Sequence, residues 1–284
     1  MYCDMHMHSI FSDGTDTPTQ LIEKAEHLGL SAVALCDHNT VSGLPEFLKA
    51  AEGKCVTAVP GVEFSTAYKE RELHILALFI KEKFYEDIMN LVSEADQRKE
   101  ESNIDLIHNL NQAGYKLDYE KIKSERPDGR VNRAHIAAAL TEAGYVSSIE
   151  EAFQNILAKK HGYYHPPKRL DALEIIRYIK SIGAVAVWAH PFFNLKEKQV
   201  REFLNDAKPC GLDGMETIYS TYTDEETKLA ISIAKEYVLL QSGGSDYHGN
   251  NKPDIQMGIG RGNLRIPNII FKEMVKIVNL KIDL

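Results

Sequence analysis

The chain has 284 residues, a formal net charge of −8 and no run approaching the roughly 20 apolar residues that cross a bilayer. This charge disfavours non-specific binding to nucleic acid, which depends mainly on lysine and arginine. Apolar residues make up 44% and charged residues 26%, as in ordinary globular domains. The first residues lack a basic segment followed by an apolar run. We therefore expect a cytoplasmic protein that binds neither membranes nor duplex DNA.

The cysteines are widely spaced and form no CxxC pair. Three of them lie in or beside apolar runs that are typical of strands. We therefore expect reduced thiols rather than a structural thiolate zinc site. The four are Cys3, Cys36, Cys55 and Cys210.

The first 80 residues alternate short apolar runs with helical spacing, which is typical of βα units around a parallel sheet. Residues 18–28 have the apolar spacing of a helix, with Thr17 as its cap and Gly29 at its end. Strands are expected near residues 2–8, 31–36, 56–62 and 73–80.

Residues 83–168 show helical patterns without convincing strands, and the βα alternation resumes after them. We therefore expect an α/β barrel formed by residues 1–82 and 169–284, with residues 83–168 as an inserted helical subdomain that caps it. In the second barrel segment, helices are expected at 171–182, 196–207 and 223–236, and strands at 184–190, 213–218 and 237–244.

The chain opens with two histidines that are two residues apart. Alternate strand residues share a face, so His6 and His8 can converge on one ion while Met5 and Met7 turn toward packing. For this motif alone, two partly exposed histidines are an equal alternative. Ionisable residues recur where later strands end, however, and burying so many without an ion would be costly. The candidate metal ligands are His6, His8, Asp13, His38, Glu63, His74, His190, Asp246 and His248.

Imidazole nitrogens and carboxylate oxygens suit zinc, manganese or iron better than calcium, and this set of ligands does not distinguish among the three metals.

Asp4 and Asp37 lie next to proposed ligands, where they either orient a histidine or serve as polar residues of the barrel core. His27 and His108 fall within helical patterns away from strand ends, so we interpret both as structural.

The segment HMHSIFSDGTDTPTQLIEKAEHLGLSAVALCDHNTVSG resembles the opening of the PHP (polymerase and histidinol phosphatase) superfamily. The resemblance implies a distorted (β/α)7 TIM-like barrel that holds two or three divalent metal ions, and a phosphoesterase that uses metal-activated water. Later segments that match are Gly61-Val62-Glu63, His74, Ala189-His190-Pro191 and Gly244-Ser245-Asp246-Tyr247-His248.

The resemblance also implies how the ligands are shared. Three divalent ions against three carboxylates would leave a positive pocket that attracts phosphate. His190, His248 and Asp246 are the candidate catalytic residues, and the acid that protonates the leaving group stays open between His190, His248 and water. The implied sets are His6, His8, Glu63 and Asp246 for one ion, Glu63, His74 and His190 for a second, and Asp13, His38 and His248 for a third.

Within the insertion, Arg133 and His135 lie in the first turn of an expected helix, where an anion is favoured. A solvated helix start is the alternative on residue chemistry alone. A branch of the PHP family with a similar insertion carries an Arg-Pro-His-Ile-Ala type motif here, with Ala134 replacing its proline. That branch hydrolyses nucleoside 3′,5′-bisphosphates and RNA 5′ ends, so Arg133 and His135 are expected to bind substrate. Tyr163 or Tyr164 either stacks on a base or packs in its loop.

The sequence thus predicts a metal-dependent phosphatase or phosphodiesterase that acts on small nucleotides or short RNA. Histidinol phosphate phosphatase, or another small-molecule phosphatase of the family, is the alternative. An amide hydrolase in a related metal barrel is disfavoured because no lysine at a strand end suits its usual bridge. A non-catalytic metal-binding domain is disfavoured because the ligand positions are intact. The oligomeric state stays open.

Overall fold

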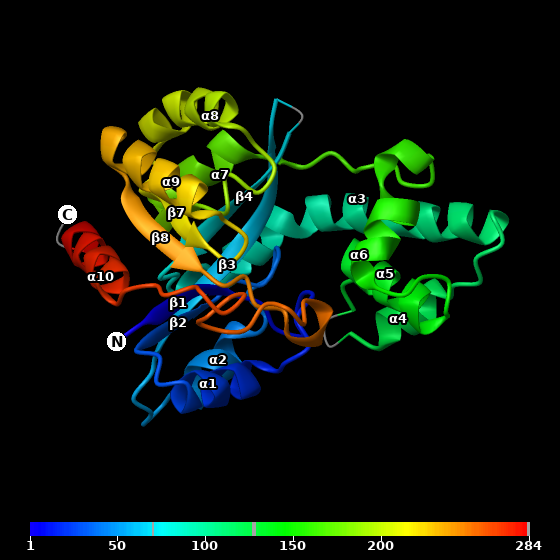
Figure 1. The fold of residues 1–284 in the computed structure, drawn as a ribbon, viewed down its shortest axis with the longest axis horizontal. Coiled ribbons are helices and arrows are strands. Elements are labelled where there is room, and N and C mark those ends of the chain that lie inside the picture. The colour runs from blue at the N-terminus through cyan, green and yellow to red at the C-terminus, as the bar shows by residue number, and fades with distance from the viewer. Residues whose placement is uncertain (70, 127–128, 283–284) are drawn as a thin grey trace.

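The computed structural model describes residues 1–69, 71–126 and 129–282. Their strands form one sheet in the order β1-β2-β3-β4-β6-β7-β8, and β5 pairs with β3. The sheet is nearly closed, because Asp246 N donates to His6 O and His8 N donates to Tyr247 O, both at 2.9 Å (Figure 1). The predicted α/β barrel is confirmed. Its strands are β1 (Cys3–Met7), β2 (Ala32–Leu35), β3 (Thr57–Tyr68), β4 (Arg71–Leu78), β5 (Leu170–Asp171), β6 (Val185–Trp188), β7 (Gly214–Tyr219) and β8 (Leu240–Gly244).

Helices surround the barrel, and further helices project to one side as the insertion (Figure 1). None of the helices among the described residues is long and apolar enough to cross a membrane. The α-helices are α1 (Pro18–His27), α2 (Leu44–Ala50), α3 (Tyr85–Gln112), α4 (Tyr119–Ser124), α5 (Arg133–Glu142), α6 (Ile149–Ala152), α7 (Ala172–Ser181), α8 (Glu197–Cys210), α9 (Asp224–Glu236) and α10 (Ile269–Ile282). Shorter helical segments are η1 (Glu82–Phe84), η2 (Phe153–Leu157), η3 (Lys159–His161) and η4 (Gly249–Asn251).

Local sequence explains where the first helix begins and ends. The Thr17 side chain accepts a hydrogen bond from Gln20 N, and the Gln20 side chain accepts one from Thr17 N, which forms a capping box at the start of α1. Gly29 follows the helix with φ of 67°, a conformation that glycine adopts without steric cost. The predicted cap and end of this helix are both confirmed.

The strand pair β3 and β4 departs from the expected parallel sheet. These strands form an antiparallel hairpin that runs from the pair Gly61 and Leu78 to the pair Tyr68 and Arg71, and β4 is also antiparallel to β6. Residues 63–68 extend the first of the two expected strands, and residues 71–72 belong to the second. His74 therefore lies in the first half of an antiparallel strand, and the expectation that it follows a strand end was wrong.

Two apolar clusters cover the two faces of the strands. Met5 belongs to a cluster enclosed by the strands and α10, whereas Met7 belongs to the larger cluster beneath the surrounding helices. The register of β1 against β2 shifts between Asp4 and Met7, so the strand is irregular around the two methionines. Simple alternation predicted a shared packing face for them, and the structure places them in different clusters.

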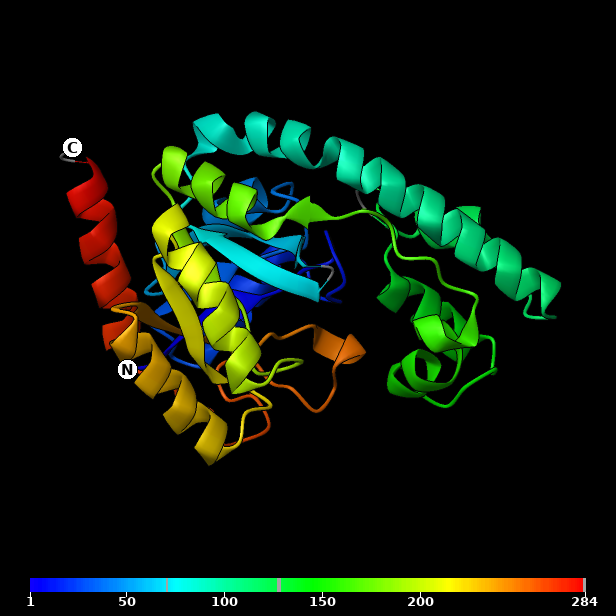
Figure 2. The same cartoon turned by 90° about the horizontal axis from the view of Figure 1, so that it is seen from above.

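Helix α3 connects the barrel to the inserted helices (Figure 2). Its first half contributes Ile88 and Val92 to the barrel's outer cluster, and its second half contributes Leu106 and Leu110 to a separate cluster within the insertion. One continuous helix therefore belongs to two hydrophobic cores. This arrangement places the insertion beside the end of the barrel where the candidate ligands lie.

The closure of the barrel depends on a glycine at the end of β8. A Cβ atom on Gly244 would lie 2.2 Å from the Cβ atom of His6. We expect Gly244→Ala to lower the free energy of unfolding by about 3 kcal/mol, since the strands must separate to fit a methyl group. Gly29→Ala, where φ is positive but space is open, should cost only about 1 kcal/mol. Chemical denaturation measures both, and equal costs would contradict this view of the closure.

Candidate metal centre

All nine candidate ligands gather at one end of the barrel. The parallel ladders continue past the strands, because Cys36 N donates to Met7 O at 2.8 Å and Glu63 N donates to Asp37 O at 3.2 Å. His190 and Asp246 follow β6 and β8 with positive φ values of 35° and 56°. Such backbone conformations are unfavourable for residues with a side chain and are frequent at functional sites.

Four ligand atoms from distant parts of the chain converge on one point. His6 Nε2 and His8 Nε2 are 3.0 Å apart, and each is 3.2 Å from Glu63 Oε2. Asp246 Oδ1 lies 3.6 Å from His6 Nε2 and 3.2 Å from His8 Nε2. Ligand atoms around a four-coordinate ion with bonds of about 2.1 Å are separated by roughly 3.4 Å. The spacing of these atoms therefore suits a small divalent cation.

Glu63 connects this group to a second one. Its Oε1 atom lies 2.9 Å from His74 Nδ1 and 3.1 Å from His190 Nε2. Its Oε2 atom lies 3.2 Å from His38 Nδ1 as well as facing the first group. The two oxygens of one buried carboxylate thus face two groups of imidazoles, an arrangement compatible with the bridging role that the family resemblance implies.

A third group forms around Asp13. Its Oδ1 atom lies 3.2 Å from His248 Nε2 and 3.6 Å from His8 Nδ1, and its Oδ2 atom lies 3.8 Å from His38 Nε2. His38 thus presents one ring nitrogen to Glu63 and the other to Asp13. The third group is close enough to the first two for all the candidate ligands to form a single centre.

Two buried atoms of the centre lack the partner that burial normally requires. Within the described residues, neither Glu63 Oε2 nor His38 Nδ1 has a hydrogen-bond partner, although imidazole nitrogens surround the carboxylate oxygen. Leaving such groups unpaired is costly, and a cation between them removes the cost. The donor set and its unsatisfied atoms therefore fit divalent metal ions.

The pKa shifts reflect the close packing of buried carboxylates and imidazoles in the site. Burial raises the pKa of Glu63, but the imidazoles of His38, His6 and His74 together hold it well below its usual value. Burial lowers the pKa of His8, yet the carboxylates of Asp246, Glu63 and Asp13 raise it to about 9. Burial lowers the pKa of His38 to about 3, which leaves a neutral imidazole suited to metal binding.

Glu216 is a part of the site that the sequence reasoning missed. This fully buried residue of β7 lies with Oε1 3.0 Å from His6 Nδ1, and its Oε2 accepts a hydrogen bond from His190 N at 2.7 Å. A carboxylate on the far nitrogen turns Nε2 of His6 toward the metal position. The signal in the sequence was a single ionisable residue within a strand whose other residues are uncharged.

Asp4 and Asp37 hold the backbone beside the ligands, and within the described part of the chain neither forms a hydrogen bond or ion pair with an imidazole. Asp37 accepts hydrogen bonds from Ser9 N at 2.7 Å and from Ser12 Oγ at 2.5 Å. Asp4 accepts them from Ser245 N and Gly258 N, both at 2.8 Å. The sequence left two roles open for these aspartates, orienting a histidine or being polar residues of the barrel core. Neither role describes them fully, because they hold the loops that carry His8 and Asp246.

Asp246 is oriented by two donors that the sequence reasoning also missed. Tyr219 Oη and Lys252 Nζ each donate to its Oδ2 atom at 2.7 Å. The other carboxylate oxygen, Oδ1, is the one that faces His6 and His8. The two donors therefore hold Oδ2, and Oδ1 is left to bind a metal ion.

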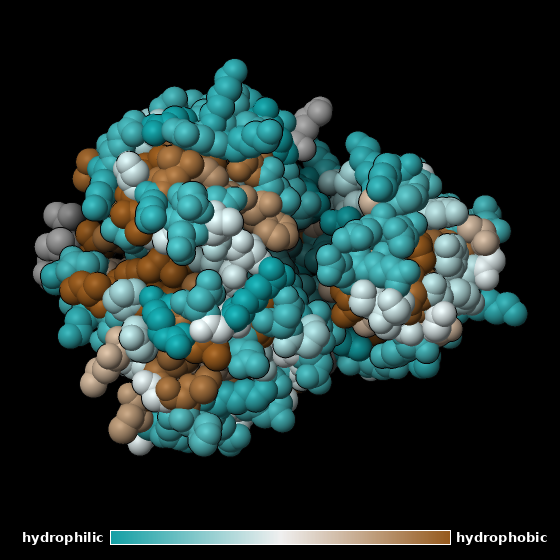
Figure 3. All heavy atoms as spheres, in the orientation of Figure 1, coloured by the Kyte–Doolittle hydropathy of each residue, from teal (hydrophilic) through white to brown (hydrophobic). Residues whose placement is uncertain are grey.

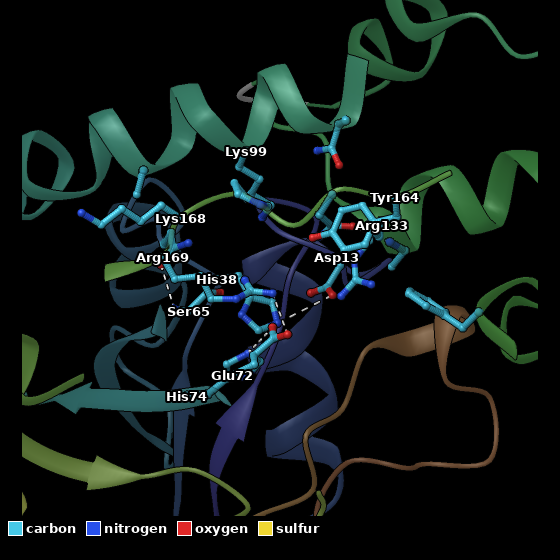
Figure 4. Close-up of a pocket in the computed structure, with 17 residues that line it drawn as sticks. Asp13, His38, Ser65, Glu72, His74, Lys99, Arg133, Tyr164, Lys168 and Arg169 are labelled. Atoms are coloured by element: carbon cyan, nitrogen blue, oxygen red, sulfur yellow. Dashed lines mark hydrogen bonds and ion pairs between the residues drawn. The ribbon is translucent and has the colours of Figure 1, made fainter. Parts of the chain in front are cut away.

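A cavity of about 190 Å³ opens between the metal centre and the insertion. Asp13, His38 and His74 contribute its barrel wall, and Lys99 and Arg133 reach it from the insertion side (Figure 4). The hollow between the two parts of the molecule is lined largely by hydrophilic residues (Figure 3). The cavity is thus a polar space that contains metal ligands and cationic side chains together.

The two expected substrate residues of the insertion lie in different surroundings. Arg133 lines the cavity. His135 is buried outside the cavity wall, and its Nδ1 atom accepts a hydrogen bond from Asn132 N at 3.2 Å within the cap of α5. Burial lowers the pKa of His135 to about 4. The structure therefore brings Arg133, and not His135, to the accessible surface of the site.

The tyrosines considered as base-stacking residues already have partners. Tyr164 is buried, and the guanidinium carbon of Arg133 lies 4.3 Å from its ring centroid. Tyr163 contacts Tyr115 with ring centroids 6.3 Å apart. The packing alternative describes both residues, and Tyr164 additionally holds Arg133 in place.

A barrel whose mouth gathers histidines and carboxylates around unsatisfied ligand atoms defines a metal-dependent hydrolase. Comparison with known proteins agrees. Residues 4–164 match the model of the PHP domain. A 5′-3′ exoribonuclease of Haemophilus influenzae is 33% identical over 86% of this chain and 89% of its own length. A phosphoribosyl 1,2-cyclic phosphate 1,2-diphosphodiesterase of Eggerthella lenta is 31% identical over 87% and 94%.

A solved structure of a provisionally assigned metal-dependent phosphoesterase from Bifidobacterium adolescentis superposes with a TM-score of 0.86 at 28% identity, covering 97% of this chain and 96% of the other. The chain belongs to the PHP domain family. It is a metal-dependent phosphoesterase, and the predicted enzyme class is confirmed.

The position of Glu216 leads to a test of the centre that does not depend on substrate. We expect Glu216→Gln to weaken metal binding about 10- to 100-fold, because an amide holds the His6 ring less firmly and lowers its basicity. Titration of the metal-free protein with Mn²⁺ or Zn²⁺, followed by calorimetry, measures the affinity. Glu202→Gln, which alters a surface ion pair with Lys69, is the matched control. Unchanged affinity in Glu216→Gln would contradict the assignment.

Proposed function

We propose that this phosphoesterase hydrolyses small phosphorylated nucleotides, either nucleoside 3′,5′-bisphosphates or the 5′ ends of short RNA. The observation that supports this most is the cavity in which metal ligands and insertion cations face one another. A substrate with a second phosphate would use both walls. The nine candidate ligands would hold two or three divalent ions, with manganese, zinc and iron all compatible with the donor set.

The bound ions would supply a water of lowered pKa and stabilise negative charge on the phosphate oxygens. The chain's own residues set the geometry of that chemistry. Glu216 and Asp246 orient and complete the ligand set, and His190 is the catalytic candidate that lines a cavity. His248 and Asp246 are buried, which suits roles as ligands better than contact with a leaving group.

The insertion supplies cations that form no ion pair within the described residues. Lys99, Arg133 and Lys168 are the three, and all of them line the cavity. Burial lowers the pKa of Lys99; the charges of Asp13 and Glu72 oppose this shift, and those of Arg169 and Arg133 add to it. A dianionic phosphate would relieve this repulsion. The unpaired charges therefore favour a substrate that carries a phosphate away from the metal ions.

The unpaired cations also favour a nucleotide over histidinol phosphate, the alternative substrate within the family. Histidinol phosphate carries one phosphate and a cationic amine, so it would leave the insertion cations unpaired and bring another positive charge to them. A bisphosphate or an RNA 5′ end places negative charge at both walls. The nucleotide substrate is therefore the better electrostatic match.

Metal removal tests the proposed reaction. We expect chelation to lower hydrolysis of a nucleoside 3′,5′-bisphosphate at least about a hundredfold, because no protein nucleophile replaces the ions. Addition of Mn²⁺ should restore it, as measured by release of inorganic phosphate. Full activity of the protein after exhaustive chelation, with metal content verified by elemental analysis, would refute the proposal.

Replacement of the cavity arginine tests the second phosphate position. We expect Arg133→Ala to raise KM for the bisphosphate about tenfold, the effect of losing a charge-assisted hydrogen bond, while changing KM for a simple aryl phosphate little. Steady-state kinetics with both substrates measure the difference. Arg201→Ala on α8, which loses a surface pair with Glu236, is the matched control. Equal losses on the two substrates would remove the second phosphate site.

A further inference from the structure

A second cavity, of about 200 Å³, shares the candidate metal ligand His74 with the first, also contains His190, and is lined by different side chains beyond them. Both cavities include Glu72, His74 and Arg133 in their walls. The first adds the cations of Lys99, Lys168 and Arg169, whereas the second adds the apolar side chains of Phe193, Pro191 and Leu195. The metal centre therefore opens on one side to a cationic wall and on the other to an apolar wall.

Phe193 is the exposed part of this apolar wall. Its side chain is 54% exposed, although the residue follows directly after the segment that carries His190. The ring contacts its neighbours at steep angles, with centroids 5.9 Å from His190 at 70° and 6.3 Å from Tyr219 at 75°. A single exposed aromatic residue is ordinary on a protein surface. This one lines a cavity that contains the metal ligands His74 and His190.

Two further aromatic residues, Phe153 and Tyr164, line the cationic cavity, where the guanidinium carbon of Arg133 lies 5.6 Å and 4.3 Å from their ring centroids. Among the described aromatic residues that line the two cavities, Phe193 is the one that is exposed. Stacking of a nucleobase on an aromatic side chain tolerates every base, because each has a π face.

We propose that Phe193 is a stacking platform for the nucleobase of the substrate. The base lies in the second cavity, one phosphate lies beside His74 and His190, and the other phosphate lies against the cations of the first cavity. This assignment rests on the nucleotide substrate proposed above and adds a selectivity to it. The enzyme distinguishes a nucleotide from a sugar phosphate without a base, such as the phosphoribosyl compound named for the Eggerthella lenta relative.

The experiment compares two substrates that share both phosphates. One is a purine nucleoside 3′,5′-bisphosphate, and the other is the methyl riboside 3,5-bisphosphate, which has no base. For the wild-type protein with Mn²⁺, we expect KM to be about tenfold lower for the nucleoside. In Phe193→Ala this ratio falls to about one through a rise in the nucleoside KM, and in Phe193→Tyr it is retained.

Tyr2→Ala is the matched control, because Tyr2 is 45% exposed and precedes β1 at the opposite end of the strand from His6 and His8. It should leave both substrates unchanged. Equal losses on the two substrates in Phe193→Ala, or no loss on either, would overturn the stacking role. Hydrolysis of an aryl phosphate but of neither bisphosphate by the wild-type protein would instead overturn the proposed substrate, and the stacking role with it.

A binding measurement gives an independent readout. Trp188 is the single tryptophan of the chain and lines the second cavity. We expect a nucleoside 5′-monophosphate to change its fluorescence at concentrations about tenfold lower in the wild-type protein than in Phe193→Ala. Inorganic phosphate should bind both proteins equally. A nucleotide that binds the two proteins with the same affinity would contradict the platform.

Discussion

The structure depends on the burial of one carboxylate. Glu63 is fully buried within β3, and imidazole nitrogens approach both of its oxygens. A neutral imidazole that binds a metal cannot itself balance the charge, so the carboxylate requires cations beside it. Nearby carboxylates, Glu63 among them, raise the pKa values of His8 and His74 against the effect of burial. The strand ends, loops and helices around this residue all serve to bring such positive charge to it.

The surroundings of the centre follow from that requirement. An imidazole offers its Nε2 atom in one direction only when its Nδ1 atom is held, and Glu216 does this for His6. His6 lies in β1 and Glu216 lies in β7, and both strands are irregular. The register shifts in β1 between Asp4 and Met7 and in β7 between Glu216 and Ile218. Bulges of this kind redirect side chains next to active sites. The irregular backbone of these strands thus carries both a candidate ligand, His6, and the buried carboxylate that orients it, Glu216.

The sequence predicted the features that local chemistry determines. Apolar alternation located the strands, and recurrent histidines and carboxylates located the mouth of the barrel. The hairpin of β3 and β4 was not predictable from alternation, because an antiparallel pair and a βα unit begin with the same apolar run. Glu216 was missed because a single carboxylate in a strand shows its partner only after folding. Phe193 and Tyr164 differ in accessibility through tertiary contacts that neither residue's sequence neighbours reveal.

Helix α3 fixes the position of a cavity cation, Lys99, relative to the candidate metal ligands. Helix α3 is continuous, with Val92 packed in the barrel core and Leu106 packed in the core of the insertion. Lys99 lies on the stretch between them and belongs to neither core, so its distance from the centre is fixed by both ends of the helix. For the bisphosphate substrate proposed above, this spacing would favour a matching separation between the two phosphates. The barrel would then provide the metal ligands, and α3 would set how far Lys99 lies from them.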